Sequence, residues 1–329
     1  MNVPTQEQII CGYCGWQNNV SPQALEKVQV RCSRCKLNLS TQKHSHFKHL
    51  DPAVYMHPTA AEALQQLKNL PGVQNLLGKM QALGEQSFGE AFFAANGLRV
   101  GPKQYPDLYG KLMAVCRTMG IHQMPALYLS YVDIFGDMGF YTYSGGSEAH
   151  PFIVLSPQLL STFDEMDLLA ALATEIGHIH CGHLRYKVAA DCLPLIMHKA
   201  FKKTPLEAMA ENISLPVQQA LLTWRLKANL SADRTMMLVL QNEKASFNYL
   251  LKQTGGTVSS RASLEAFVQQ AQQLNHGMVQ QWLDKYWQQF LYSHRVFSFP
   301  VWRAAELLQW TREDQKSYGY KDIVKIFSD

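Results

Sequence analysis

Apolar residues recur at helical spacing along most of this chain. After Pro58, Leu64, Leu67 and Leu70 lie three positions apart, which predicts a helix with one apolar face. Between positions 107 and 119, apolar residues again share one face of a predicted helix. We expect further helices over 73–83, from Ser161 or Asp164 past His178, and over 206–211, 217–239, 263–274 and 278–292.

A smaller part of the chain has the pattern of β-strands. Residues 126–135 are rich in Tyr, Leu, Ile and Val, which favours a strand. The segments 139–144 and 151–156 flank the turn signal Gly145-Gly146 and predict a hairpin. The sequence therefore predicts an α+β protein that is mainly helical.

Composition excludes several classes of protein. The chain has 329 residues, of which 47% are hydrophobic and 17% charged, and this balance does not fit a disordered chain. The 20 Gly and 14 Pro follow no period, so a collagen-like structure is excluded. No apolar run approaches the roughly 18 residues of a membrane span, and the N-terminus lacks the pattern of a signal peptide. We therefore expect a cytoplasmic protein without an integral membrane segment.

The positive charge is concentrated near the N-terminus. Residues 1–50 contain six Lys or Arg and two acidic residues, a net charge of +4. The rest of the chain has 24 basic and 24 acidic residues (30 minus 6 and 26 minus 2), so its net charge is zero. The main body thus shows no charge bias toward nucleic acid or an anionic membrane.

Four cysteines near the N-terminus have the spacing of a zinc ribbon. Cys11 and Cys14 form one CxxC pair, Cys32 and Cys35 form a second, and seventeen residues separate the pairs. Four thiolates close a tetrahedral shell with no open position, which is typical of a structural zinc site. A redox CxxC would need a thioredoxin-like βαβ context, which is absent here. We therefore predict a zinc ribbon over residues 1–42 that binds one zinc ion.

The ribbon is followed by a polar segment over residues 43–56. It contains His44, His46 and His49, whose spacing could bind a stray metal ion. The polar composition favours a solvated linker instead. We predict an exposed linker here and a single larger domain over residues 57–329.

The sharpest chemical signal lies in the helix predicted to run past His178. A zinc-peptidase helix carries HExxH, in which two histidines at i and i+4 bind zinc and the glutamate activates water. The corresponding residues here are Thr174, Glu175, Ile176, Gly177 and His178. The glutamate and the second histidine are present, but threonine takes the place of the first ligand.

Five segments in order resemble the HtpX-like metallopeptidase family, which includes the CAAX-prenyl endopeptidases, and in particular its soluble bacterial members. They are His57–Gly72, Pro151–Ser156, Gly177–His183, Leu230–Arg234 and Phe299–Trp310, and together they span roughly residues 57–310. The resemblance implies a zincin-like metallopeptidase fold after the ribbon. It also implies a third zinc ligand, a glutamate four residues before Asp233, where this chain has Asn229.

These replacements argue against a working zinc site. Thr and Asn are neutral and poor ligands for zinc, which prefers thiolate, imidazole and carboxylate. Without zinc, nothing activates the attacking water. We therefore interpret Thr174, Glu175, His178, Asn229 and Asp233 as a remnant site, and we expect no second zinc ion. Buried Glu175 should then have a partner, for which Thr174 and Arg234 are candidates.

Two other arrangements of side chains have potential chemical roles. His180 and His183 share a helix face, so the pair could form a metal site displaced from His178. If the helix continues past His178, both residues lie off the helix face that carries His178. Cys181 lies among these histidines, but no orienting Asn or Asp marks it as a nucleophile, and free cysteines are more often core residues.

The leading functional hypothesis is an inactive metallopeptidase-like scaffold that binds a protein partner or belongs to a larger assembly. One alternative is an active zinc endopeptidase with a non-standard metal site. A second is nucleic-acid binding through the basic ribbon, where Tyr13, Trp16 and Phe47 are interleaved with Lys and Arg.

Overall fold

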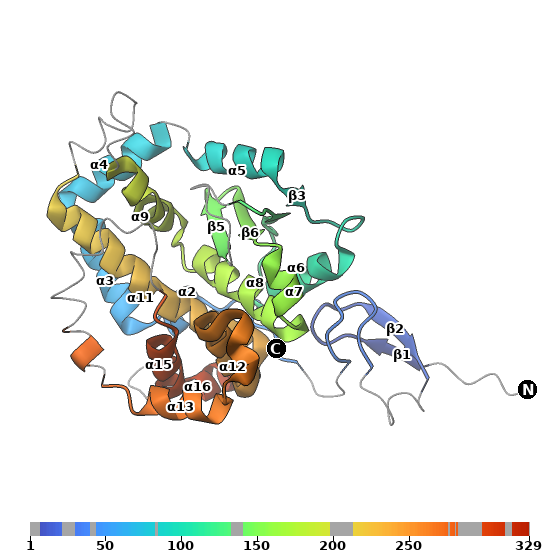
Figure 1. Cartoon of the computed structure of the whole chain (residues 1–329). Helices are drawn as coiled ribbons and strands as arrows, with labels where there is room; N and C mark the ends of the chain where they lie inside the picture. The colour runs from blue at the N-terminus through green and yellow to red at the C-terminus, as the bar shows by residue number, and fades with distance from the viewer. Residues whose placement is uncertain are drawn as a thin grey trace, which may run out of the picture.

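The computed structural model of the chain describes residues 7–21, 30–39, 44–82, 85–132, 141–197, 213–275, 277–279, 281, 298–312 and 318–328. Within them the chain is mainly helical, with a small hairpin at the N-terminal side and one four-stranded sheet (Figure 1). The predicted α+β class is therefore confirmed. The predicted helix over 206–211 and most of the one over 278–292 lie outside the described residues.

The four-stranded sheet has the order β3-β4-β6-β5. Its strands are β3 (Leu98–Arg99), β4 (Ala126–Leu129), β5 (Thr142–Gly146) and β6 (Pro151–Leu155). Strand β6 is parallel to β4 and antiparallel to β5, which forms one edge of the sheet. Strand β4 is shorter than the predicted strand over 126–135, whose residues 133–135 lie outside the described part.

The predicted hairpin forms, but its turn lies later than expected. Gly146 pairs with Pro151, so the connection is made by residues 147–150 and both glycines belong to β5. A Cβ atom at Gly145 would lie 2.8 Å from the ring of Phe152, so this glycine lets the aromatic ring pack closely. Gly145 therefore serves the packing of Phe152, whereas Gly146 has φ +90° and no room for a Cβ atom beside the backbone oxygen of His150 in the connection.

The two faces of the sheet are covered differently. Tyr128, Phe152 and Val154 form a cluster with Phe93 of helix α5 (Glu85–Asn96). Leu127, Leu129, Ile153 and Leu155 alternate with them and join the main core, which contains helices α6 (Pro106–Thr118) and α8 (Glu165–His180). Strands β4 and β6 are buried on both faces, which explains why they are almost continuously apolar.

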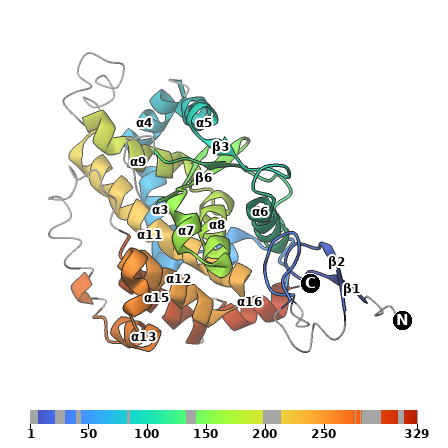
Figure 2. The same cartoon turned by 45° about the vertical axis from the view of Figure 1, so that its right-hand side comes forward.

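Helix α8 crosses the long helix α11 (Leu215–Leu240) at the centre of the domain (Figure 2). Asp164 caps α8 through a capping box with Asp167, in agreement with the predicted start. At the crossing, a Cβ atom on Gly177 would lie 2.8 Å from the Cα atom of Ala232. Only glycine allows this approach, which sets the spacing between the two helices.

The other helices surround this crossing. Those that the sequence predicted are α3 (Pro58–Asn69), α4 (Pro71–Ala82) and α13 (Leu264–Gln272). Those that it did not predict, besides α5, are α2 (Pro52–Tyr55), α7 (Gln158–Thr162), α9 (Leu184–Met197), α12 (Glu243–Gly255), α15 (Pro300–Arg312), α16 (Tyr320–Phe327) and the 3₁₀ turn η2 (Gly256–Arg261).

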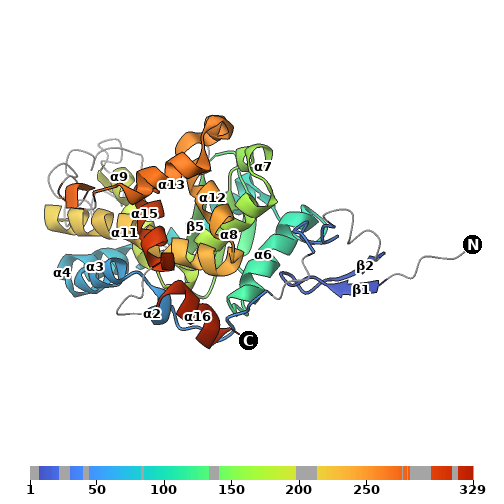
Figure 3. The ribbon, with the colours of Figure 1, turned by 90° about the horizontal axis from the view of Figure 1, so that it is seen from below.

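The N-terminal hairpin of β1 (Glu7–Ile10) and β2 (Gln17–Val20) lies beside α6 (Figures 1 and 3). The segment after it was predicted to be an exposed linker, and that prediction is wrong for its described part. Phe47, Leu50 and Tyr55 are buried, and the backbone N–H of Phe47 donates to Thr118 O at 2.6 Å. The segment contributes apolar side chains to the same core as α6 and α8.

Candidate functional site

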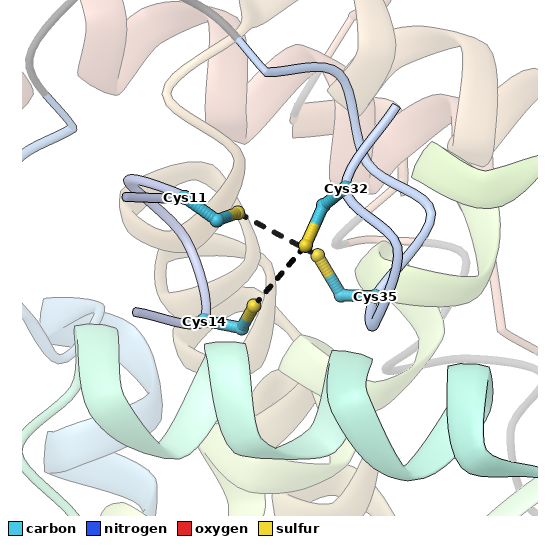
Figure 4. Close-up of side chains that lie close together, drawn as sticks. All are labelled: Cys11, Cys14, Cys32 and Cys35. Carbon is cyan, nitrogen blue, oxygen red and sulfur yellow. Dashed lines mark hydrogen bonds between the residues drawn. The ribbon is translucent and has the colours of Figure 1, made fainter. Parts of the chain in front are cut away.

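The four ribbon cysteines lie together, with their sulfur atoms directed at a common centre (Figure 4). Cys11 Sγ is 3.7 Å from Cys35 Sγ, and Cys14 Sγ is 3.6 Å from Cys32 Sγ. Sulfurs bound tetrahedrally to zinc at about 2.3 Å would be about 3.8 Å apart. The buried cluster thus has the ligand chemistry and the spacing to bind a zinc ion.

Each CxxC pair is shaped by a backbone turn of the same form. Gly15 N–H donates to Cys11 O at 2.9 Å, and Lys36 N–H donates to Cys32 O at 3.0 Å. Gly15 and Lys36 occupy equivalent positions and both have positive φ, at 74° and 61°. The matched turns explain how two separate pairs come to face one centre.

One polar residue that the sequence did not single out supports the cluster. Asn18 donates from Nδ2 to Cys32 Sγ at 3.6 Å and accepts from the backbone N–H of Ser33 at 2.8 Å. Its side chain therefore ties β2 to the second CxxC turn. Asparagine in a polar hairpin carries no signal that separates this role from an ordinary turn residue.

The ribbon is packed directly on the larger domain. A Cβ atom on Gly110 of α6 would lie 3.0 Å from Arg34 O and 3.1 Å from Cys35 Cα. Glu165, in the first turn of α8, forms an ion pair with Lys111 Nζ at 2.5 Å and lies 3.9 Å from Arg31 of the ribbon. Charged contacts and close backbone packing thus connect the cysteine cluster to α6 and α8.

The second group of predicted site residues lies where α8 and α11 cross. Thr174, Glu175 and His178 are buried on α8. The hydroxyl of Thr174 donates to the backbone carbonyl of Ala170 at 2.9 Å. This is a common hydrogen bond of a threonine within a helix.

Glu175 has two partners, and neither is one that the sequence suggested. Its Oε1 accepts from Thr142 at 2.6 Å, and its Oε2 accepts from Ser144 at 2.5 Å. The expectation that the buried carboxylate has a partner is confirmed, but Thr174 and Arg234 were the wrong candidates. Both partners come from β5, so only the packing of α8 against the hairpin reveals them.

The histidines around the end of α8 form two different contacts. The helix ends at His180, and Gly182 with φ +65° turns the chain back. His183 Nδ1 then lies 3.2 Å from His178 Nδ1, while His180 Nδ1 lies 2.7 Å from the hydroxyl of Tyr55. The structure therefore does not bring His180 and His183 together as a displaced pair.

On α11, Asn229 and Asp233 are each held by an arginine. Arg225 donates to Asn229 Oδ1 at 3.0 Å and to Asp191 Oδ1 at 2.9 Å. Arg303 of α15 donates to both oxygens of Asp233, at 2.8 and 2.5 Å. The acceptor atoms of both residues already have cationic partners.

Burial keeps the histidines neutral at neutral pH. Burial first, and then the positive charge of Arg225, lowers the pKa of His178 well below its usual range. The same two causes, in the same order, lower the pKa of His183 to about 3. Among the described residues, the four ribbon cysteines are the one group of three or more His, Cys, Asp and Glu side chains whose ligand atoms gather closely enough for a metal ion.

Comparisons with known proteins agree with this architecture. The sequence model of Peptidase family M48 matches residues 115–311, which include Thr174, Glu175, His178, Asn229 and Asp233. The chain is 28% identical over 289 residues to the plastoglobule-localized metallopeptidase 48, chloroplastic, of Arabidopsis thaliana, covering 85% of this chain and 77% of that protein. No solved structure matches the chain. None of the helices in the described residues is long and apolar enough to cross a membrane.

Proposed function

The chain belongs to peptidase family M48, and from that premise we propose that it is a member without zinc-peptidase activity. It acts as a protein-binding or scaffold subunit and carries a structural zinc ion in its N-terminal ribbon. The observation that carries this proposal is the hydrogen bond from Arg225 to Asn229, because it occupies an oxygen that a metal ion would need.

The donor set at the three ligand positions does not fit zinc. A ligand must offer a free lone pair, and the best ligands for zinc are anionic or imidazole groups. Thr174 is neutral and donates its hydroxyl proton within its own helix, and Asn229 faces a guanidinium group. Only His178 has suitable ligand chemistry, and its Nδ1 atom faces His183.

The retained glutamate also has a structural role in this proposal. Both oxygens of Glu175 accept short hydrogen bonds from hydroxyl groups of β5, so the carboxylate joins α8 to the hairpin. A general base needs an activated water molecule to deprotonate. Glu175 keeps the strand and the helix in register, which explains why it can be retained without the metal.

A peptidase fold without catalytic activity would function by binding other proteins through its surface. The ribbon presents Ile10 and Trp16, which are 59% and 45% exposed. Exposed apolar and aromatic side chains are typical of protein-binding surfaces. The packing of the ribbon on α6 would hold such a surface in a fixed orientation relative to the domain.

One observation favours nucleic-acid binding as a second candidate function. The guanidinium carbon of Arg34 lies 4.6 Å from the centre of the Trp16 ring, on an exposed part of the ribbon. Single-stranded nucleic acids bind to such pairs through stacking and phosphate contacts. Affinity for a single-stranded oligonucleotide that falls steeply with salt and is lost on Trp16→Ala would favour this candidate.

The proposal is tested by metal content and proteolysis of the full chain. Native mass spectrometry should find one zinc ion per chain, which is lost when Cys11, Cys14, Cys32 and Cys35 are replaced by serine. With zinc supplied, cleavage of an unfolded protein substrate should not exceed that of a Glu175→Gln control. A second zinc ion that survives the cysteine replacements, or cleavage abolished by Glu175→Gln, would favour an active peptidase with a non-standard site.

A further inference from the structure

A chain of charged side chains crosses the interior beside His178. Lys187 Nζ lies 3.1 Å from Asp191 Oδ2, and Asp191 Oδ1 accepts from Arg225 Nε at 2.9 Å. Arg225 also donates from Nη1 to Asn229 Oδ1 at 3.0 Å. Lys187 and Asp191 belong to α9, and Arg225 and Asn229 belong to α11, so the chain joins these two helices.

This cluster has one more positive than negative charge. Lys187 is buried, Asp191 is 7% exposed, and the Arg225 side chain is 13% exposed. Burial raises the pKa of Asp191, but the charges of Arg225 and Lys187 outweigh it and lower the pKa below its usual value. One carboxylate therefore fixes two cations in the interior, and the buried carboxylate of Glu175 lies close enough to act on Lys187 electrostatically.

The guanidinium group of Arg225 lies beside the crossing of α8 and α11. Arg225 touches Asn229 directly, and His178 and His183 lie close enough to feel its charge. Both histidines are uncharged near neutral pH, so they tolerate a neighbouring cation without like-charge repulsion. A divalent ion beside the same guanidinium would meet that repulsion and would also find Asn229 Oδ1 already taken.

We propose that Arg225, fixed by Asp191, is a built-in cation that takes the place of a metal ion between α8 and α11 and keeps metal ions out. This inference rests on the proposed function, in which the domain works without zinc. It goes further because it assigns the exclusion of metal to a residue outside the three ligand positions.

The same cluster closes the edge of the sheet. Tyr141 O accepts from Ser156 N, so it points toward the β6 side of the hairpin. Carbonyl groups alternate sides along a strand, and Ser144 O therefore points to the free edge of β5. Lys187 Nζ donates to Ser144 O at 3.1 Å. Lys187, which is paired with Asp191 Oδ2, thus binds a carbonyl oxygen that an added peptide strand would use as an acceptor.

The test restores zinc ligands at positions 174 and 229, in the presence and in the absence of Arg225, and measures the zinc content. In the full chain, Thr174→His and Asn229→Glu together restore an imidazole and a carboxylate. We expect this double variant to bind one zinc ion per chain, like the wild type. Adding Arg225→Gln should raise the content to two ions per chain. Adding Lys227→Gln instead, a matched loss of positive charge on the same helix, should leave it at one.

A variant with fewer substitutions provides a second test in case the triple variant, Thr174→His with Asn229→Glu and Arg225→Gln, does not fold. Thr174→His with Arg225→Gln retains Asn229 and places two imidazoles at i and i+4, which suffices for a Co²⁺ titration followed by visible absorption. We expect at least tenfold tighter Co²⁺ binding at this site than in Thr174→His with Lys227→Gln. The four ribbon cysteines are replaced by serine in both proteins, so that this site alone is measured.

The outcomes separate the two proposals. A second zinc ion in the double variant with Arg225 intact, or equal Co²⁺ affinities in the two smaller variants, would overturn the role of Arg225. The loss of peptidase activity would still stand in that case. A second zinc ion in the unaltered chain would instead overturn the proposed function itself.

Discussion

His178 and His183 face each other across the turn that ends α8, with their Nδ1 atoms 3.2 Å apart. Both side chains are buried, and the His183 ring also packs edge-on against Trp224 at a centroid distance of 5.4 Å. One imidazole must donate and the other accept, so the accepting ring must be neutral. Protonation of the accepting nitrogen breaks the hydrogen bond, and protonation of either ring introduces a buried charge.

The burial of His183 makes stability depend on pH. The pKa of His183 is lowered to about 3, mainly by burial, whereas an unfolded histidine titrates near about 6.5. The stabilisation is therefore complete above pH about 6.5 and is lost as the pH falls toward 3. At pH 5, His183 alone should reduce the free energy of unfolding by about 2 kcal/mol.

Urea unfolding at pH 7.5 and pH 5 measures this loss. His183→Asn keeps a hydrogen-bonding group near the Nδ1 position but does not titrate in this range. The variant should be less stable than the wild type at pH 7.5, and the difference should shrink at pH 5. Equal dependence on pH in the two proteins would contradict the assignment.

Glu175 should contribute to stability. Glu175→Ala leaves the buried hydroxyl of Ser144 and the part-buried hydroxyl of Thr142 without their acceptor, and we expect a loss of about 3 kcal/mol. Glu175→Gln keeps the shape, and the hydroxyls can rotate, so its loss should be about 1 kcal/mol. Urea unfolding compares the two variants. A gain in stability on Glu175→Ala would instead indicate a residue kept for chemistry at the expense of stability.

Removal of zinc from the ribbon should weaken the protection of α6 against amide hydrogen exchange. The ribbon cysteines belong to the same apolar core as α6, and Gly110 touches the backbone at Cys35. Chelation of zinc should therefore increase amide hydrogen exchange over residues 106–118 and lower the melting temperature. Unchanged exchange in α6 would show that the ribbon folds independently of the domain.

Gly110→Ala offers a control that spares the thiolates. The added methyl group would press on the ribbon backbone, at a cost of about 1–3 kcal/mol for overpacking. A gain of about 1 kcal/mol in helix propensity offsets part of this cost. Exchange in α6 should rise as after chelation, while the zinc content stays at one ion per chain.

The ion pair of Asp233 and Arg303 should be costly to break from one side. Both residues are buried, and two hydrogen bonds join them. Asp233→Asn leaves the guanidinium group without its counter-charge, and we expect a loss of about 3–5 kcal/mol in the free energy of unfolding. Asp233→Leu combined with Arg303→Met should recover most of it. Additive losses in the double variant would disprove the pairing.

The sequence determined those features that depend on near neighbours. The spacing of Cys11 and Cys14, and of Cys32 and Cys35, predicted a cluster that the structure brings together. Asp164 marked the start of α8, because a capping box needs only residues three positions apart. The segments flanking Gly145 predicted the hairpin, although Gly145 serves the packing of Phe152.

Other elements lacked a clear local signal. Helix α9 contains a proline and lies between the sheet and α11, so its sequence does not show the single apolar face that marks a surface helix. The segment 44–56 has polar histidines, yet Phe47 and Tyr55 are buried among residues far away in the chain. The predicted domain boundaries and the cytoplasmic location remain predictions.

Tertiary structure alone decided the chemistry of the central site. The motif and the family resemblance implied that Thr174 and Asn229 stand at ligand positions, but not what surrounds them. The partners of Glu175 lie on β5, and the partner of Asn229 is held by Asp191 of another helix. The spacing of residues along a helix specifies which side chains share a face. The close crossing at Gly177 and the packing of α9 specify which charged groups meet between α8 and α11. Each buried polar atom there needs a hydrogen-bond partner, and that partner comes from an element distant in the sequence.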